Sequence, residues 1–143
     1  MSSLNNFRKN IYSQDGEDGV IDEIFNRLAI NKGTFVEFGA WDGKHLSNTF
    51  ALLEKNWKGV YIEGDKTRFQ DLIQNMKSRK DNVELINLYV EHHGANTLDN
   101  ILSRTKLKKN FDLLSIDIDT YDWHVWQSLK NFTPKVVVIE INS

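Results

Sequence analysis

The sequence predicts an α/β fold built on a doubly wound, parallel, Rossmann-like sheet. Five short apolar runs with the length of strands alternate with segments whose apolar residues recur at helical spacing. The runs are almost continuously apolar, which is typical of strands that helices cover on both faces. Glycines and acidic residues follow several runs, where open sheets of this kind bind ligands. We expect all five strands to be parallel, in the order 3-2-1-4-5.

The first helix is expected from about Gln14 to Leu28. Its apolar residues recur three or four positions apart, and acidic residues lie near its start, where the helix dipole favours negative charge. Gly33 follows the last apolar turn and fits a helix stop.

The five strands are expected in the runs TFVEFG (34–39), GVYIEG (59–64), VELINLYV (83–90), FDLLSIDI (111–118) and KVVVIEI (135–141). Apolar stripes between these runs predict helices near 46–57, 69–76, 98–107 and 125–129. Thr97 is the expected N-cap of the helix that begins at Leu98.

Length and composition indicate one domain, residues 1–143. The chain has 143 residues, 40% hydrophobic residues and a formal net charge of −2, so no global charge attracts nucleic acid or an anionic membrane. Cysteine is absent, which excludes disulfides and thiolate metal sites. The N-terminus has no apolar run of a signal peptide, and no segment approaches the roughly 20 apolar residues of a membrane span. We expect a soluble, cytoplasmic protein without a nucleic-acid or membrane partner.

Acidic residues gather at the ends of the predicted strands. Taken singly, each is more often a helix cap or a solvated loop residue than a functional group. Glu37 differs because it lies within a strand that should be covered on both faces, where an unpaired carboxylate is costly. It needs a hydrogen-bond donor or a ligand. The other strand-end acids are Asp42, Glu63, Asp65, Asp117, Asp119, Asp122 and Glu140.

The turn after the first strand does not suit a pyrophosphate. A dinucleotide fingerprint requires G-x-G-x-x-G, whereas this turn has only Gly39 and Gly43, with Asp42 where phosphates would lie. Glu63 does follow the turn by about the 20 residues expected for an acid that binds ribose hydroxyls. The residues therefore favour a nucleoside without a pyrophosphate, and the cation S-adenosylmethionine meets that description. A nicotinamide dinucleotide-type Rossmann domain and a non-catalytic binding module remain the alternatives.

Four segments, in order, carry a resemblance to a known family. The E-x-G-x-x-x-G of Glu37–Gly43 and the YIEGD of Tyr61–Asp65 resemble motifs of class I S-adenosylmethionine-dependent methyltransferases. SQDGEDGVIDEIF from Ser13 and LLSIDIDTYDWHVWQSL from Leu113 are similar to segments of the FkbM-like group within that class. The chain departs from the FkbM-like pattern at Thr120, where glycine is usual, and at the nearby acids, which are aspartates in place of glutamates.

The resemblance implies a role for each strand end. The turn backbone would pass close to the methionine part of the cofactor, with Glu37, Asp42 and Asp117 near its ammonium group. Glu63 would accept both ribose hydroxyls, and adenine would pack between Gly64 and the loop around Val90 and Glu91. The implied cofactor-binding residues are Glu37, Gly39, Ala40, Asp42, Gly43, Glu63, Gly64 and Asp117.

The resemblance further implies methyl transfer to an oxygen of a small molecule or sugar. The cofactor is already activated, so placing the acceptor supplies much of the rate. An oxygen acceptor also needs a base, for which Asp119, His124 and Glu140 are the candidates, together with Asp122. The alternative for His124 is a structural role in which the ring packs against its neighbours and does not act as a base.

A divalent metal is a further expectation, similar to that of catechol-type methyltransferases. Asp119, Glu140 and Asn142 are hard oxygen ligands at neighbouring strand ends, which suits magnesium or calcium. Helix capping is the alternative role for the same residues.

Class I methyltransferases generally continue past the fifth strand, whereas this sequence stops at Ser143. The expected sheet therefore lacks the last strands of the full methyltransferase fold. We expect Val136–Ile139 to form an edge strand that is only partly covered. Either the sequence is part of a longer protein, or a second copy of the chain closes this edge as a homo-oligomer.

Overall fold

The computed structural model describes residues 3–8, 17–39, 48–117 and 122–139. Its centre is a five-stranded sheet in the order β3-β2-β1-β4-β5, in which every neighbouring pair is parallel. The strands are β1 (Thr34–Phe38), β2 (Lys58–Ile62), β3 (Val83–Ile86), β4 (Leu113–Ile116) and β5 (Val136–Ile139). The predicted fold class and strand order are confirmed.

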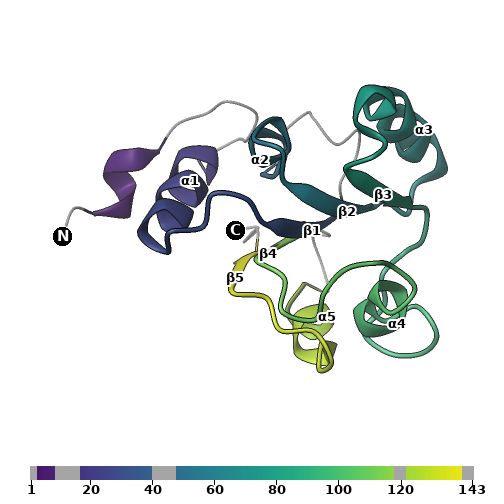
Figure 1. Cartoon of the computed structure of the whole chain (residues 1–143). Helices are drawn as coiled ribbons and strands as arrows, with labels where there is room; N and C mark the ends of the chain where they lie inside the picture. Colours follow the sequence, from purple (N-terminus) through teal and green to yellow (C-terminus); the bar gives the residue numbers. More distant parts are fainter. Residues whose placement is uncertain (1–2, 9–16, 40–47, 118–121, 140–143) are drawn as a thin grey trace.

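Helices cover both faces of the sheet (Figure 1). One face carries α1 (Glu17–Arg27), α2 (Phe50–Glu54) and α3 (Lys66–Asn75), and the other carries α4 (Leu98–Leu102) and α5 (Asp122–Ser128). Two short 3-10 helices complete the described elements, η1 (Leu4–Phe7) beside α1 and η2 (Lys77–Arg79) after α3.

Alternation along the strands produces two cores. In β1, Phe35 packs with the α1–α3 layer, whereas Val36 and Phe38 pack with α4 and α5. Glu37 follows the alternation and points to the same face as Phe35 and Tyr61. The two cores are apolar, whereas the polar residues Glu37, Glu63 and Asp117 lie at the carboxyl ends of the strands.

Several predicted boundaries were wrong, and the helix predicted near 98–107 ends at Leu102. The first helix ends at Arg27, one residue before the expected end, but the left-handed residue that follows it is Ala29, at φ 57°, and not the expected stop Gly33. The stripe predicted near 46–57 forms a helix only over Phe50–Glu54 among the described residues. The third strand ends at Ile86, before Asn87. Thr97 does cap α4, because its hydroxyl accepts from the Asn100 N–H at 3.3 Å.

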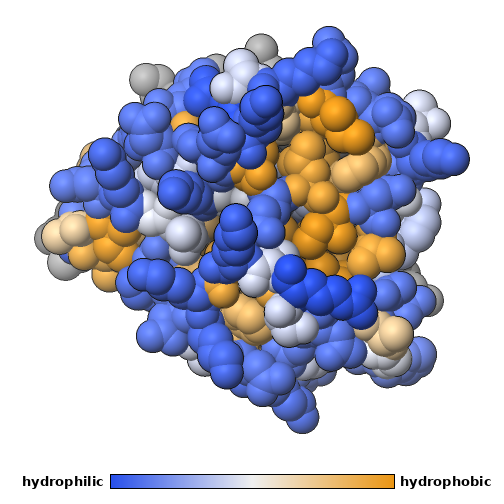
Figure 2. All heavy atoms as spheres, turned by 45° about the vertical axis from the view of Figure 1, so that its right-hand side comes forward, coloured by the Kyte–Doolittle hydropathy of each residue, from blue (hydrophilic) through white to orange (hydrophobic). Residues whose placement is uncertain are grey.

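Both edges of the sheet are incompletely covered. All four residues of β5 are half-buried, as predicted for an edge strand, and so are the four of β3. Figure 2 turns the β3 side of the molecule forward and shows apolar side chains gathered in a band framed by hydrophilic ones. Within the described ranges, no helix has the length and apolar content needed to cross a bilayer.

Candidate functional site

The candidate site lies at the carboxyl ends of the strands, around the point where the strand order reverses. β1 is central, with β2 on one side and β4 on the other. In open α/β sheets, ligands bind at this switch point because the connections leave in opposite directions and open a crevice. Gly39 follows β1 with φ 71°, a left-handed conformation that glycine adopts without steric cost.

Glu37 is held by protein donors. Its side chain is buried, with 4% of the residue exposed. Oε1 accepts from the Asn48 N–H at 3.1 Å and the Ser115 hydroxyl at 3.2 Å. Oε2 accepts from the Thr49 hydroxyl at 3.2 Å. These hydrogen bonds offset the cost of burying the carboxylate. They also connect Glu37 in β1 with Asn48 and Thr49, which lead into α2.

The polar group around Glu37 extends to both neighbouring strands. Thr49 Oγ1 also shares a hydrogen bond with the Tyr61 hydroxyl of β2 at 3.0 Å. The Asn48 side-chain amide donates to Ser115 Oγ of β4 at 3.2 Å. The end of β1 is therefore fixed relative to both β2 and β4, which keeps the switch point in one geometry.

Glu63 directly follows β2 and is also buried, at 5% exposed. Its Oε2 accepts from the Asp65 N–H at 2.8 Å, and its own N–H donates to the Ile86 carbonyl at 2.9 Å. Asp65 in turn caps α3 by accepting from the Arg68 N–H at 2.8 Å. The carboxylate is thus held by the turn that starts α3.

Asn87, the first residue after β3, lies against this turn. Its side-chain amide donates to the carbonyl oxygen of Glu63 at 2.8 Å and to that of Gly64 at 3.2 Å. The two protons of the amide nitrogen suit these two acceptors, whereas a flipped amide would face both carbonyls with its oxygen.

Tyr89 contacts Gly64 through its ring. A Cβ built on Gly64 would lie 2.2 Å from Tyr89 Cδ1, so only glycine fits beneath the ring in this arrangement. Tyr89 is nevertheless 67% exposed to solvent. An exposed aromatic ring against the glycine that follows a buried carboxylate is suited to stack on a flat base while the carboxylate binds a ribose.

Asp117 and His124 mark the opposite side of the switch point. Asp117 follows β4, is half-buried, and donates its N–H to the Phe38 carbonyl at 3.2 Å. His124 lies exposed on α5, with its ring 5.5 Å from that of His92, which in turn lies 4.4 Å from the ring of His93. The structure thus brings the histidines of the β3–α4 connection next to the candidate base.

Several predicted site residues lie outside the described residues: Ala40, Asp42, Gly43, Asp119, Glu140 and Asn142. For Asp122, the structure describes the backbone in α5 only. Among the side chains that the structure does describe, no group of three histidines or acids is arranged to hold a metal ion. The metal expectation, which rests on Asp119, Glu140 and Asn142, stays a prediction.

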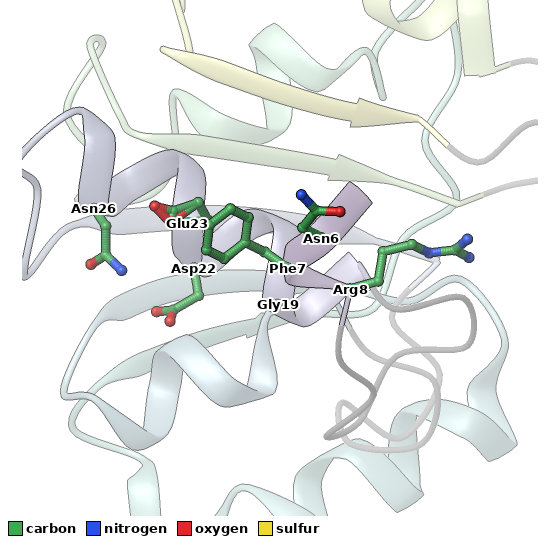
Figure 3. Close-up of a pocket in the computed structure, with 7 residues that line it drawn as sticks. All are labelled: Asn6, Phe7, Arg8, Gly19, Asp22, Glu23 and Asn26. Atoms are coloured by element: carbon green, nitrogen blue, oxygen red, sulfur yellow. The ribbon is translucent and has the colours of Figure 1, made fainter. Parts of the chain in front are cut away.

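A separate pocket opens between η1 and α1 (Figure 3), with a volume of about 410 Å³. None of its lining residues follows a strand, so it does not belong to the candidate site. They are Asn6, Phe7, Arg8, Gly19, Asp22, Glu23 and Asn26.

The sequence interpretation missed Asn87 and Tyr89. It extended the third strand to Val90 and so placed both residues inside a strand. An amide in the middle of an apolar run, level with Glu63 in the neighbouring strand, was the available signal. Similarly, Asn48, Thr49 and Ser115 could not be assigned to Glu37, because the predicted strand order places β4 beside β1 without giving the register that sets Ser115 opposite Glu37.

No protein-family model matches the chain, and no curated protein matches its sequence. Solved structures do match. A candidate O-methyltransferase of Klebsiella pneumoniae superposes with a TM-score of 0.56 at 13% identity, over 87% of this chain and 57% of that one. An S-adenosylmethionine-dependent methyltransferase of Clostridium acetobutylicum gives 0.54 at 12% identity, over 89% and 49%. A candidate enzyme of the same class from Methanococcus maripaludis gives 0.52 at 14% identity, over 80% and 49%.

These likenesses establish the fold. The chain has the Rossmann-like α/β fold of class I methyltransferases, with the sheet order seen here. It spans about half the length of the solved structures that it matches.

Proposed function

We propose that the chain is the cofactor-binding domain, residues 1–143, of an S-adenosylmethionine-dependent methyltransferase. The observation that carries the proposal is a pair of buried carboxylates, Glu37 and Glu63, at the ends of the neighbouring central strands β1 and β2. Gly39, in its left-handed conformation, directly follows β1. A cationic nucleoside suits these two negatively charged acceptors better than a pyrophosphate does.

Each end of the cofactor has residues that suit it. Glu63 would accept hydrogen bonds from the ribose hydroxyls, and Gly64 and the Tyr89 ring would contact the adenine. Glu37 and Asp117, with the turn residues Gly39, Ala40, Asp42 and Gly43, would surround the methionine end. Because the protein donors on Glu37 fix its position, its negative charge reaches the ammonium without reorganisation when the ligand binds.

The cofactor supplies an activated methyl group when bound, and the chain's residues need only position the acceptor and remove a proton. We propose an oxygen of a small molecule or sugar as the acceptor, following the FkbM-like resemblance. The candidate bases remain Asp119, His124 and Glu140. Of these, the structure describes only His124, whose exposure on α5 leaves it accessible to an acceptor.

Isothermal titration calorimetry tests the proposal directly. S-adenosylmethionine and its demethylated product S-adenosylhomocysteine should bind in a 1:1 ratio, whereas NAD⁺ and NADH should give no heat. Binding of the dinucleotides alone would establish the alternative, a dinucleotide-binding Rossmann domain. Absence of binding by all four ligands would favour the other alternative, that the chain is a non-catalytic binding module.

A further inference from the structure

Asn87 directly follows the edge strand β3, and its side chain contacts the turn that follows the neighbouring strand β2 at Glu63. β3 pairs with β2 from Gly59↔Val83 to Ile62↔Ile86, so Asn87 comes level with Glu63 as the pairing ends. At this point the chain leaves the sheet, and the backbone no longer supplies donors to β2. The Asn87 side chain supplies them instead, to two consecutive carbonyls.

This contact constrains the direction of the Glu63 side chain. The Ile86 carbonyl holds the Glu63 N–H at 2.9 Å, and Asn87 holds the Glu63 carbonyl at 2.8 Å. With both flanking peptide planes fixed, the Cα–Cβ bond of Glu63 has one direction. The second bond of Asn87, to the Gly64 carbonyl at 3.2 Å, fixes the next peptide plane as well.

We infer that Asn87 is a positioning residue for Glu63 in nucleoside binding. This inference rests on the proposed function. Asn87 acts through the backbone of the turn and has no need to contact the ligand. Its amide is suited to the role because it offers two protons from one nitrogen, whereas a serine offers one and a carboxylate offers none.

The experiment compares S-adenosylhomocysteine binding by calorimetry in the 143-residue chain and its variants. Asn87→Ala should weaken binding about tenfold, since the turn that aims Glu63 loses two hydrogen bonds. Asn87→Asp keeps the size of the side chain but faces two carbonyl oxygens with a carboxylate, so it should weaken binding at least as much. A role of Asn87 in packing alone would leave Asn87→Asp close to the unmodified chain.

Asn100→Ala is the matched control. The Asn100 side-chain amide also donates to a glycine carbonyl, that of Gly94 at 3.1 Å, on an exposed part of the chain away from Glu63. This variant should bind S-adenosylhomocysteine within twofold of the unmodified chain.

A double-mutant cycle separates positioning from general stability. If Asn87 acts through Glu63, adding Asn87→Ala to Glu63→Ala should weaken binding by no more than about twofold beyond Glu63→Ala alone. Thermal unfolding of each variant shows that it is folded. If Asn87→Ala loses its cooperative transition, Asn87→Asp decides, and loss of the transition in both would overturn the inference by making Asn87 a residue of global stability.

The other outcomes are equally decisive. Unchanged binding by folded Asn87→Ala would overturn the inference and leave the proposed function intact. Fully additive losses in the cycle would show that Asn87 does not act through Glu63, which also overturns it. Absence of S-adenosylhomocysteine binding by the unmodified chain would overturn the proposed function and this inference together.

Discussion

Glu37 and Ser115 are directly opposite each other on the adjacent strands β1 and β4, and the serine hydroxyl donates to the glutamate carboxylate at 3.2 Å. The pair is buried and joins residues 78 positions apart in the sequence. It lies at the switch point of the sheet, so the same contact that joins the two strands also places a negative charge at the candidate site.

Glu37→Ala should lower the free energy of unfolding by about 2–4 kcal/mol. The substitution removes the acceptor of the Asn48 N–H and of the Thr49 and Ser115 hydroxyls, and unsatisfied buried donors are costly. Urea denaturation measures the effect. Asp71→Ala, on an exposed position of α3, should change stability by less than about 0.5 kcal/mol. A cost for Glu37→Ala as small as that of the control would mean that water satisfies the donors.

Glu63→Ala should weaken S-adenosylhomocysteine binding by about 1–3 kcal/mol, because the ribose hydroxyls would lose their acceptor in a largely buried site. Calorimetry measures this change. Glu54→Ala, on α2 and exposed, is the control and should bind as the unmodified chain does. Equal affinities for Glu63→Ala and Glu54→Ala would remove Glu63 from the site.

The sheet was predictable from the sequence because each strand is marked by residues that are adjacent in the sequence. Each strand is a short apolar run such as KVVVIEI, and strands that alternate with helices have few arrangements open to them. Glu37 was also recognisable, since a carboxylate inside an apolar run requires a partner. Its actual donors, Asn48, Thr49 and Ser115, depend on the three-dimensional arrangement and carry no sequence signal of their own.

The end of β3 shows where the sequence pattern misled. Leu88 and Val90 continue the apolar character of the strand, and both pack against the core of the α4–α5 face. Periodicity cannot distinguish such a segment from strand. The chain leaves the sheet at Asn87, whose side chain bonds to the Glu63 turn, and a tertiary contact of this kind is not encoded in the apolar pattern.

Gly64→Ala should destabilise the chain by about 0.5–1.5 kcal/mol, because the new methyl group would overlap the Tyr89 ring. The ring is exposed enough to move, which keeps the cost modest. In a Tyr89→Ala background the same substitution should cost less than about 0.5 kcal/mol. Urea denaturation of the four chains gives the coupling energy.

Gly59→Ala provides the contrasting case. A Cβ built there would lie 2.2 Å from the Phe35 ring, which is fully buried and packed against the Tyr61 ring at 5.3 Å. Because this ring cannot move into solvent, the cost should exceed about 3 kcal/mol. Equal costs at positions 59 and 64 would show that the exposure of the ring does not govern the effect.

The β5 edge makes a prediction about association. The Val136 N–H donates to the Asp112 carbonyl at 2.9 Å, on the side of β4, so strand alternation directs the Val137 N–H to the open edge. If a second copy of the chain pairs with this edge, Val137→Pro should convert a dimer to a monomer without breaking the β4–β5 ladder. Val136→Pro, which removes a ladder donor, should instead destabilise the fold.

Analytical ultracentrifugation over a range of concentrations, with thermal unfolding of each variant, distinguishes these results. An unmodified chain that stays monomeric throughout would exclude self-association through β5 over that range. A dimer that persists in folded Val137→Pro would place the interface elsewhere.

The central position of β1 has a consequence for how the chain folds. β1, β2 and β3 are consecutive in the sequence and can pair before the rest of the sheet exists, whereas the chain must cross back over β2 and β1 before β4 can pair with the other side of β1. Pairing over so long a separation carries a high entropic cost, so we expect the β1–β4 junction to form late and to open early. A ligand at the switch point would touch both sides of that junction. Its binding energy would then hold closed the part of the sheet that separates first, and saturating S-adenosylhomocysteine should slow unfolding as well as raise the melting temperature.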